Sequence, residues 1–198
     1  MSKRLVCGVG VNDADYKTSL YKRIDGKTTR IWECPHRSTW VHMLTRCYSK
    51  KSLRERPSYT GCSVCTEWLM FSNFKAWMSR QDWKGKQLDK DILIPGNKVY
   101  SPATCAFVSR QLNQFFVDSA ASRGDWPVGV HWNKNAGKFG AKCRNPFTGK
   151  PEHLGYHLSA DSAHRAWRRR KYELACQYAA TETDSRVAAA LRARFAPQ

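Results

Sequence analysis

The stretch VGVHWNKNAGKFGAKCRNPFTGKPEHLGYH, residues 128–157, decides the fold of the second half of the chain. It contains three short runs with β-forming residues, and the turn dipeptides Ala136-Gly137 and Thr148-Gly149 separate them. These features predict three short antiparallel strands over residues 128–133, 138–144 and 152–157.

The middle run alternates in polarity along its length. Lys138, Gly140, Lys142 and Arg144 alternate with Phe139, Ala141 and Cys143. Because successive side chains of a strand point to opposite faces, one face of the sheet should be basic and the other apolar. An apolar face must be covered, and an alanine-rich helix is expected from Ser159, followed by a second helix over 182–194.

Residues 126–178 resemble the three-stranded DNA-binding domain of plant ethylene-response factors, which phage proteins also carry. The matching pieces are Gly-Val-x-Trp at 129–132, Gly-Lys-aromatic-x-Ala at 137–141 and Leu-Gly-Tyr at 154–156. The resemblance implies a sheet that lies in the major groove of double-stranded DNA. By position it implies DNA contacts at His131, Lys138, Lys142, Arg144 and His153.

Three further residues are candidate nucleic-acid contacts. Trp132 would stack on a sugar or base, or belong to the core. Arg168 and Arg169 lie in a basic run on the expected helix, where contact with phosphate and exposure to solvent are both open. The family often has Arg at the position of His131, so base specificity is expected to differ here.

The first half of the chain has a mixed pattern. Residues 5–11 read as a strand, and residues 20–32 as a hairpin around Asp25-Gly26. Apolar spacing predicts helices over 36–48, 67–79 and 107–118. The small and polar residues 119–127 suggest a linker, which divides the chain into modules 1–118 and 128–198.

The stretch from Trp40 to Asn113 resembles phage HNH-type homing endonucleases. The match includes Trp-x-x-Met-Leu-x-Arg-Cys-Tyr from Trp40, Leu-Asp-x-Asp from Leu88 and a helical Asn113. It implies a ββα-metal nuclease module, with Asp89 and Asn113 as ligands of Mg²⁺ or Mn²⁺. Asp89 and Lys90 then become the candidate catalytic residues, with Lys90 at the position of the general-base His.

This departure weakens the nuclease interpretation. A lysine with an ordinary pKa of about 10.4 is a poor base at neutral pH. The alternative for Asp89 and Asn113 is a turn held by hydrogen bonds from carboxylate and amide groups. His36 and His42 would replace the missing base only if the fold brings one of them close.

The eight cysteines open a second metal question. Cys62-x-x-Cys65 has the spacing of a zinc knuckle but no second pair of this kind, so buried free thiols are favoured over Zn²⁺. The chain shows neither a signal peptide nor a run of transmembrane length, which predicts a cytoplasmic protein without a membrane partner.

Charge gives the broadest indication of function. The net charge is +18, with 20 basic and 10 acidic side chains in residues 1–120 and 14 and 6 in 121–198. Both halves are therefore basic, which favours a polyanionic partner. We predict an α+β protein in which a degenerate ββα-metal module precedes a three-stranded antiparallel sheet packed on a helix. The expected function is duplex DNA binding with metal-dependent cleavage or nicking. The alternatives are a catalytically inactive DNA-binding protein and an RNA-binding protein, and the sequence carries no trace of a host-protein partner.

Overall fold

The computed structural model describes residues 5–117 and 125–196, and these contain both helices and small sheets, so the chain is α+β. It divides into two compact units, Met1–Ser109 and Arg110–Gln198. Residues 119–124 of the expected linker lie outside the described residues. Among the described residues, no helix is long and apolar enough to cross a membrane.

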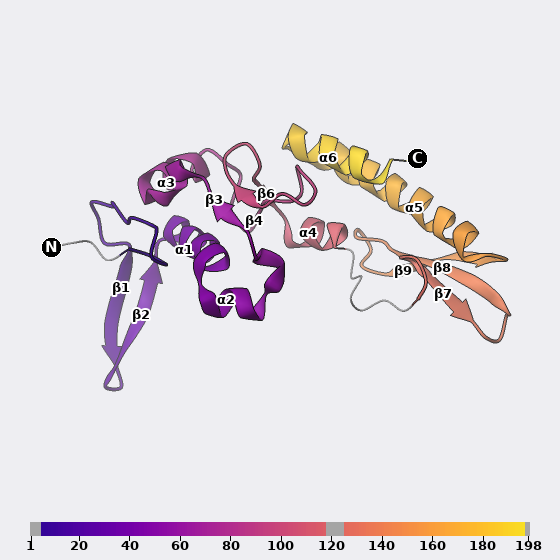
Figure 1. The fold of residues 1–198 in the computed structure, drawn as a ribbon, viewed down its shortest axis with the longest axis horizontal. Coiled ribbons are helices and arrows are strands. Elements are labelled where there is room, and N and C mark those ends of the chain that lie inside the picture. Colours follow the sequence, from indigo (N-terminus) through magenta and orange to yellow (C-terminus); the bar gives the residue numbers. More distant parts are fainter. Residues whose placement is uncertain (1–4, 118–124, 197–198) are drawn as a thin grey trace. The chain divides into compact units, whose positions relative to one another are not determined.

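The first unit combines short helices with small two-stranded sheets (Figure 1). In chain order its elements are β1 (Ser19–Ile24), β2 (Lys27–Glu33), α1 (Pro35–Tyr48), α2 (Lys50–Glu55), η1 (Pro57–Tyr59), β3 (Ser63–Val64), η2 (Thr66–Leu69), α3 (Phe71–Met78), β4 (Gln87–Asp89), β5 (Val99–Tyr100) and β6 (Ala106–Val108). The strand pairs are β1–β2 and β4–β6, both antiparallel, and β3–β5, which is parallel.

The core of the first unit forms around α1. Pro35 occupies the first turn, and Trp40, Met43, Leu44 and Cys47 are buried at helical spacing. The indole Nε1 of Trp40 donates a hydrogen bond of 2.7 Å to the carbonyl of Trp68. The expected helix over 36–48 and the expected hairpin are therefore confirmed.

Two expected elements of this unit differ from the structure. Residues 5–11 form a turn, because Val6 and Gly10 exchange backbone hydrogen bonds of 2.8 and 2.9 Å. The helix expected over 67–79 is interrupted at Met70, where Val11 pairs with the chain as an isolated parallel bridge. The strand predicted over 5–11 was therefore wrong, and the helix predicted over 67–79 is confirmed over Phe71–Met78. The pairing of Val11 with Met70 joins distant parts of the chain, so local spacing could not reveal it.

The second unit is a sheet covered by helices. Its elements are α4 (Arg110–Phe116), β7 (Val130–Asn133), β8 (Lys138–Arg144), β9 (Pro151–His157), α5 (Ala160–Thr181) and α6 (Ser185–Phe195). The strand order is β7-β8-β9, and all pairs are antiparallel, as the sequence predicts. Ser159 Oγ caps α5 by accepting a hydrogen bond from Ser162 N, and Ser162 Oγ in turn accepts one from Ser159 N.

Helix α4 belongs to this second unit rather than to the first. Phe115 on α4 has ring contacts with Tyr178 on α5 and Phe195 on α6, at 5.6 and 5.3 Å between centroids. Lys171 on α5 also donates a hydrogen bond of 2.7 Å to the Phe115 carbonyl. These contacts explain why the compact units divide at Ser109, nine residues before the module end expected at residue 118.

Candidate nucleic-acid interface

The strand register separates the residues of the sheet into two faces. Ala141 and Cys143 of β8 are buried, whereas Lys138, Lys142 and Arg144 are exposed. Buried residues Ala163, Leu174 and Ala175 of α5 lie on the helix that packs against the three strands. The alternation expected along β8 is thus present, and its basic side chains lie on the face that α5 leaves open.

A bulge in β9 brings two aromatic side chains onto this open face. Gly140 pairs with Tyr156 while Lys142 pairs with His153, so β9 has one more residue than β8 between these pairs. Gly155, at the bulge, has φ +95°, a conformation that favours glycine. Because of this extra residue, His153 and Tyr156 lie on the same face of the sheet although they are three residues apart. Their rings contact each other edge to face, with 4.7 Å between the centroids.

His131 lies across the middle of the open face. It pairs with Gly140, and a Cβ atom at Gly140 would lie 2.5 Å from the imidazole Cε1. The imidazole of His131 can lie against β8 because Gly140 has no side chain. Burial lowers the pKa of His131, and the charges of Lys142 and His153 lower it further. His131 is therefore neutral and has positively charged neighbours. A phosphate that binds beside it would favour the protonated imidazole.

The open face has a single sign of charge. Glu152 is the only acidic residue in the three strands, and it pairs with Cys143, which faces α5. The basic and imidazole groups on the face are His131, Lys138, Lys142, Arg144 and His153. A face of this composition attracts phosphate and carries imidazole, amide and phenol groups able to contact base edges.

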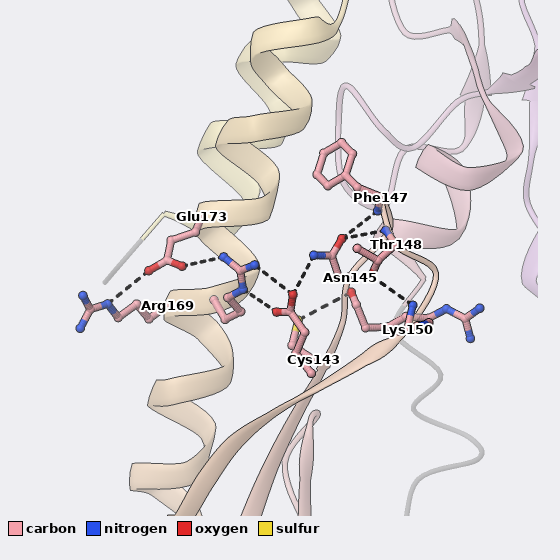
Figure 2. Close-up of polar contacts among 10 residues, drawn as sticks. Cys143, Asn145, Phe147, Thr148, Lys150, Arg169 and Glu173 are labelled. Carbon is pink, nitrogen blue, oxygen red and sulfur yellow. Dashed lines mark hydrogen bonds and ion pairs between the residues drawn. The ribbon is translucent and has the colours of Figure 1, made fainter.

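Glu152 joins the sheet to α5 through hydrogen bonds from Arg170. Figure 2 shows the polar contacts of this region, with Asn145 and Glu173 among the labelled residues. The carboxylate of Glu152 accepts bonds of 2.6 and 3.1 Å from Nε and Nη2 of Arg170 and a bond of 2.7 Å from Asn145. The hydrogen bonds from Arg170 and Asn145 lower the pKa of Glu152 to about 2. Asn145 also accepts bonds from the backbone N–H groups of Phe147 and Thr148 in the β8–β9 turn. One network therefore orients the helix, the turn and both strands behind the open face.

Three of the predicted contact residues lie away from this face. Trp132 pairs with Phe139, so it belongs to the side that carries Ala141, and its ring packs edge to face on Phe139 at 4.8 Å. Arg168 and Arg169 lie on α5, where Arg168 donates to the Ala196 carbonyl and Arg169 pairs with Glu173 at 3.4 Å. The open face itself retains His131, Lys138, Lys142, Arg144 and His153.

Two residues of the face, Asn133 and Tyr156, are not among the contacts predicted from the sequence. Tyr156 is half exposed, and its hydroxyl accepts a hydrogen bond of 2.8 Å from Asn133 Nδ2. The sequence alone does not show which face of the sheet carries Tyr156, because this depends on the bulge in β9. The glycine inside an otherwise regular strand was the signal that could have indicated a change of facing.

The candidate catalytic residues of the first unit hold a loop together. Asp89 Oδ1 accepts bonds of 2.8 and 2.7 Å from the N–H groups of Asp91 and Ile92. Lys90 is buried, and its ammonium donates to the Asp91 carboxylate and, at 2.9 Å, to the Asn97 carbonyl. Asn97 Nδ2 in return donates to the carbonyls of Lys90 and Val99. These contacts match the alternative considered for Asp89, in which its carboxylate holds a turn through hydrogen bonds.

The electrostatics of Lys90 oppose a role as a base. Burial by itself lowers the pKa of Lys90, but the hydrogen bond and charge of Asp91 outweigh it and raise the pKa above the ordinary value. The ammonium therefore keeps its proton at neutral pH. Burial raises the pKa of Asp89, although the N–H groups of Asp91 and Ile92 oppose this shift.

The two proposed ligands of Mg²⁺ or Mn²⁺ belong to different units of the chain. Asp89 is on β4 of the first unit, whereas Asn113 is half-buried on α4 of the second. Within residues 5–117 and 125–196, no three His, Cys, Asp or Glu side chains gather as a metal site. Cys62 is buried and Cys65 is half-buried, and both are free thiols. Burial raises the pKa of Cys65 and raises the pKa values of Cys47 and Cys105 to about 12.

Comparison with known proteins adds no family to these observations. No family model, curated protein or solved structure matches the chain.

Proposed function

We propose that the protein binds double-stranded DNA through the open face of β7, β8 and β9. The observation that carries the proposal is the single-sign face itself: Lys138, Lys142 and Arg144 are exposed side by side along β8, opposite the covered apolar face. A twisted sheet with such a face fits the major groove, and strands are a known means of reading it. The net charge of +18 supports a polyanionic partner.

We propose binding without phosphodiester cleavage as the better of the two DNA functions. Nuclease chemistry of the ββα-metal kind needs a group that activates water, and the ion-paired, protonated Lys90 does not supply one. The carboxylate of Asp89 accepts two backbone hydrogen bonds that stabilise a loop. We expect this function in a reducing cytoplasm, which the eight free cysteines favour.

Binding to a fluorescent 30-base-pair duplex, measured by anisotropy over a range of salt concentrations, tests the proposal. Lys142→Ala/Arg144→Ala should weaken binding about tenfold or more and reduce the salt slope by about two, because each lost phosphate contact removes close to one released counterion. The matched control, Arg165→Ala/Arg169→Ala, removes two exposed charges from α5. Equal losses in both variants would reduce the effect to net charge and overturn the sheet as the binding face.

A plasmid assay in Mg²⁺, Mn²⁺ or EDTA separates the two DNA functions. We expect retarded plasmid without nicks under all three conditions. Nicks that require metal and disappear in Asp89→Asn would instead establish an endonuclease. A matched RNA duplex distinguishes the remaining class, since its deep, narrow major groove does not admit a sheet.

A further inference from the structure

The β1–β2 hairpin of the first unit is exposed on both faces. Of its thirteen strand residues, eleven are exposed, and only Ser19 and Glu33 at the base are half-buried. Among the described residues its strands pair only with each other, and Figure 1 shows the hairpin projecting from the rest of the unit. It carries large apolar side chains in this position: Leu20 (43%), Tyr21 (60%), Ile24 (43%), Ile31 (54%) and Trp32 (43%) are exposed by the fractions given.

An isolated hairpin of this composition indicates a binding surface. Two strands without a covered face are marginally stable in water, and clustered exposed apolar side chains mark interaction sites. The cross-strand pair Leu20–Trp32 places two apolar groups next to each other near the base. The hairpin therefore has both the exposed backbone edges and the apolar area that a partner would cover.

The charges of the hairpin identify the chemistry of that partner. Lys22, Arg23 and Lys27 have no ion-pair partner within the described part of the chain, whereas Arg30 pairs with Glu33 at 2.7 Å. Lys22 and Arg23 are adjacent on β1, so they point to opposite faces. A lipid surface would accept cations on one face only. A groove of duplex DNA has phosphate walls on both sides of whatever enters it.

We propose that the β1–β2 hairpin is a second duplex-DNA contact, which enters the major groove with its cations on the two phosphate walls. The major groove is about 12 Å wide and admits a two-stranded ribbon, whereas the minor groove, about 6 Å wide, is too narrow for it. Tyr21, which pairs with Arg30, would then stack or pack against the edges of bases. The hairpin shares its ligand with the β7–β9 sheet but none of its residues.

The test compares two triple variants of the full chain on the 30-base-pair duplex. Lys22→Ala/Arg23→Ala/Lys27→Ala removes the unpaired cations of the hairpin. The matched control, Lys50→Ala/Lys51→Ala/Lys84→Ala, removes three exposed cations elsewhere in the same unit. We expect the hairpin variant to bind about tenfold or more weakly and to lower the salt slope by two to three, about one for each phosphate contact, and the control to lose far less.

Trp32→Ala gives a second readout that does not depend on charge. It should weaken duplex binding with an unchanged salt slope, because it removes apolar contact but no phosphate contact. Circular dichroism and sedimentation of every variant establish that the fold and the oligomeric state are unchanged.

Several results would overturn the proposal. Native-like affinity of the hairpin variant would do so, as would equal losses in hairpin and control variants. A native dimer that the hairpin variant converts to a monomer would assign the surface to a second copy. Tighter binding to anionic vesicles than to the duplex would assign it to a membrane. The sheet variant separates the two proposals, since loss in one variant with native affinity in the other supports one site alone, and a native chain that binds no duplex refutes both.

Discussion

The imidazole of His131 lies against Gly140 of the neighbouring strand, in space that a side chain at Gly140 would fill. Gly140→Ala should therefore displace the ring or strain the strand, at a cost of about 1–3 kcal/mol in the free energy of unfolding. Duplex binding should weaken with it, because His131 leaves the centre of the open face.

A double-mutant cycle with His131→Ala isolates this relationship. The three atoms nearest to a Cβ at Gly140 all belong to the imidazole of His131. The destabilising effect of Gly140→Ala should therefore largely vanish in the His131→Ala background. Urea unfolding of the four proteins measures the coupling. Additive free energies would show that Gly140 serves some purpose other than accommodating the ring.

Glu152 should make the second unit sensitive to acid. The pKa of Glu152 in the folded chain is about 2, compared with an ordinary 4.5, so the folded state binds this proton less readily than the unfolded state. The stabilisation is present above about pH 4.5 and is lost as the pH falls towards 2. Thermal unfolding between pH 2 and 7 should show a steeper acid decline for the native chain than for Glu152→Gln.

Glu173→Gln provides the control for that experiment. Glu173 also pairs with Arg170, at 2.9 Å, but within the described residues its hydrogen bonds and ion pairs are to arginines of α5 rather than to the strands. Its variant should keep most of the native acid decline. An identical decline in native and Glu152→Gln proteins would mean that the contact between Arg170 and Glu152 contributes nothing to stability in solution.

The three-stranded sheet could be predicted because its signals are local. Alternation along 138–144 fixes which residues share a face, and Gly137 and Gly149 mark the turns. The facing of Tyr156 could not be predicted in the same way. It depends on the bulge at Gly155, and that bulge is set by the register between β8 and β9.

The candidate sites were harder to predict than the sheet, because the contacts of their side chains involve residues far away in the sequence. Arg170 was one member of a basic run, and nothing in the run shows that Glu152, eighteen residues earlier, would bind it while Arg169 stays exposed. Lys90 likewise has an acidic neighbour in sequence, but its burial and its bond to the Asn97 carbonyl require the folded loop. Side-chain charge could be counted from the sequence, whereas its pairing could not.

Lys171 should give the second unit an alkaline signature. Burial lowers the pKa of Lys171 to about 8, while its ammonium lies 3.4 Å from the ring centre of Phe115. The unfolded chain binds this proton more readily, so the contribution of Lys171 to stability rises with pH between about 8 and 10.5. As the pH rises over this range, the native chain should gain unfolding free energy relative to Lys171→Met, by up to about 3 kcal/mol.

Lys150→Met is the matched control, because Lys150 is exposed in the β8–β9 turn. Its difference from the native chain should stay flat over the same pH range. A flat difference for Lys171→Met as well would place the Lys171 ammonium in contact with water.

Two substitutions at Asp89 separate a structural carboxylate from a metal ligand. Asp89→Ala leaves the N–H groups of Asp91 and Ile92 without their acceptor and should cost about 1–3 kcal/mol of unfolding free energy. Asp89→Asn keeps an oxygen in the same place and should cost less than about 1 kcal/mol. Urea unfolding in Mg²⁺ and in EDTA measures both, and the curves of each protein should coincide in the two buffers. A stabilisation by Mg²⁺ that is present in the native chain and absent in Asp89→Asn would make Asp89 a metal ligand, since a ligand that binds only the folded state must raise its stability.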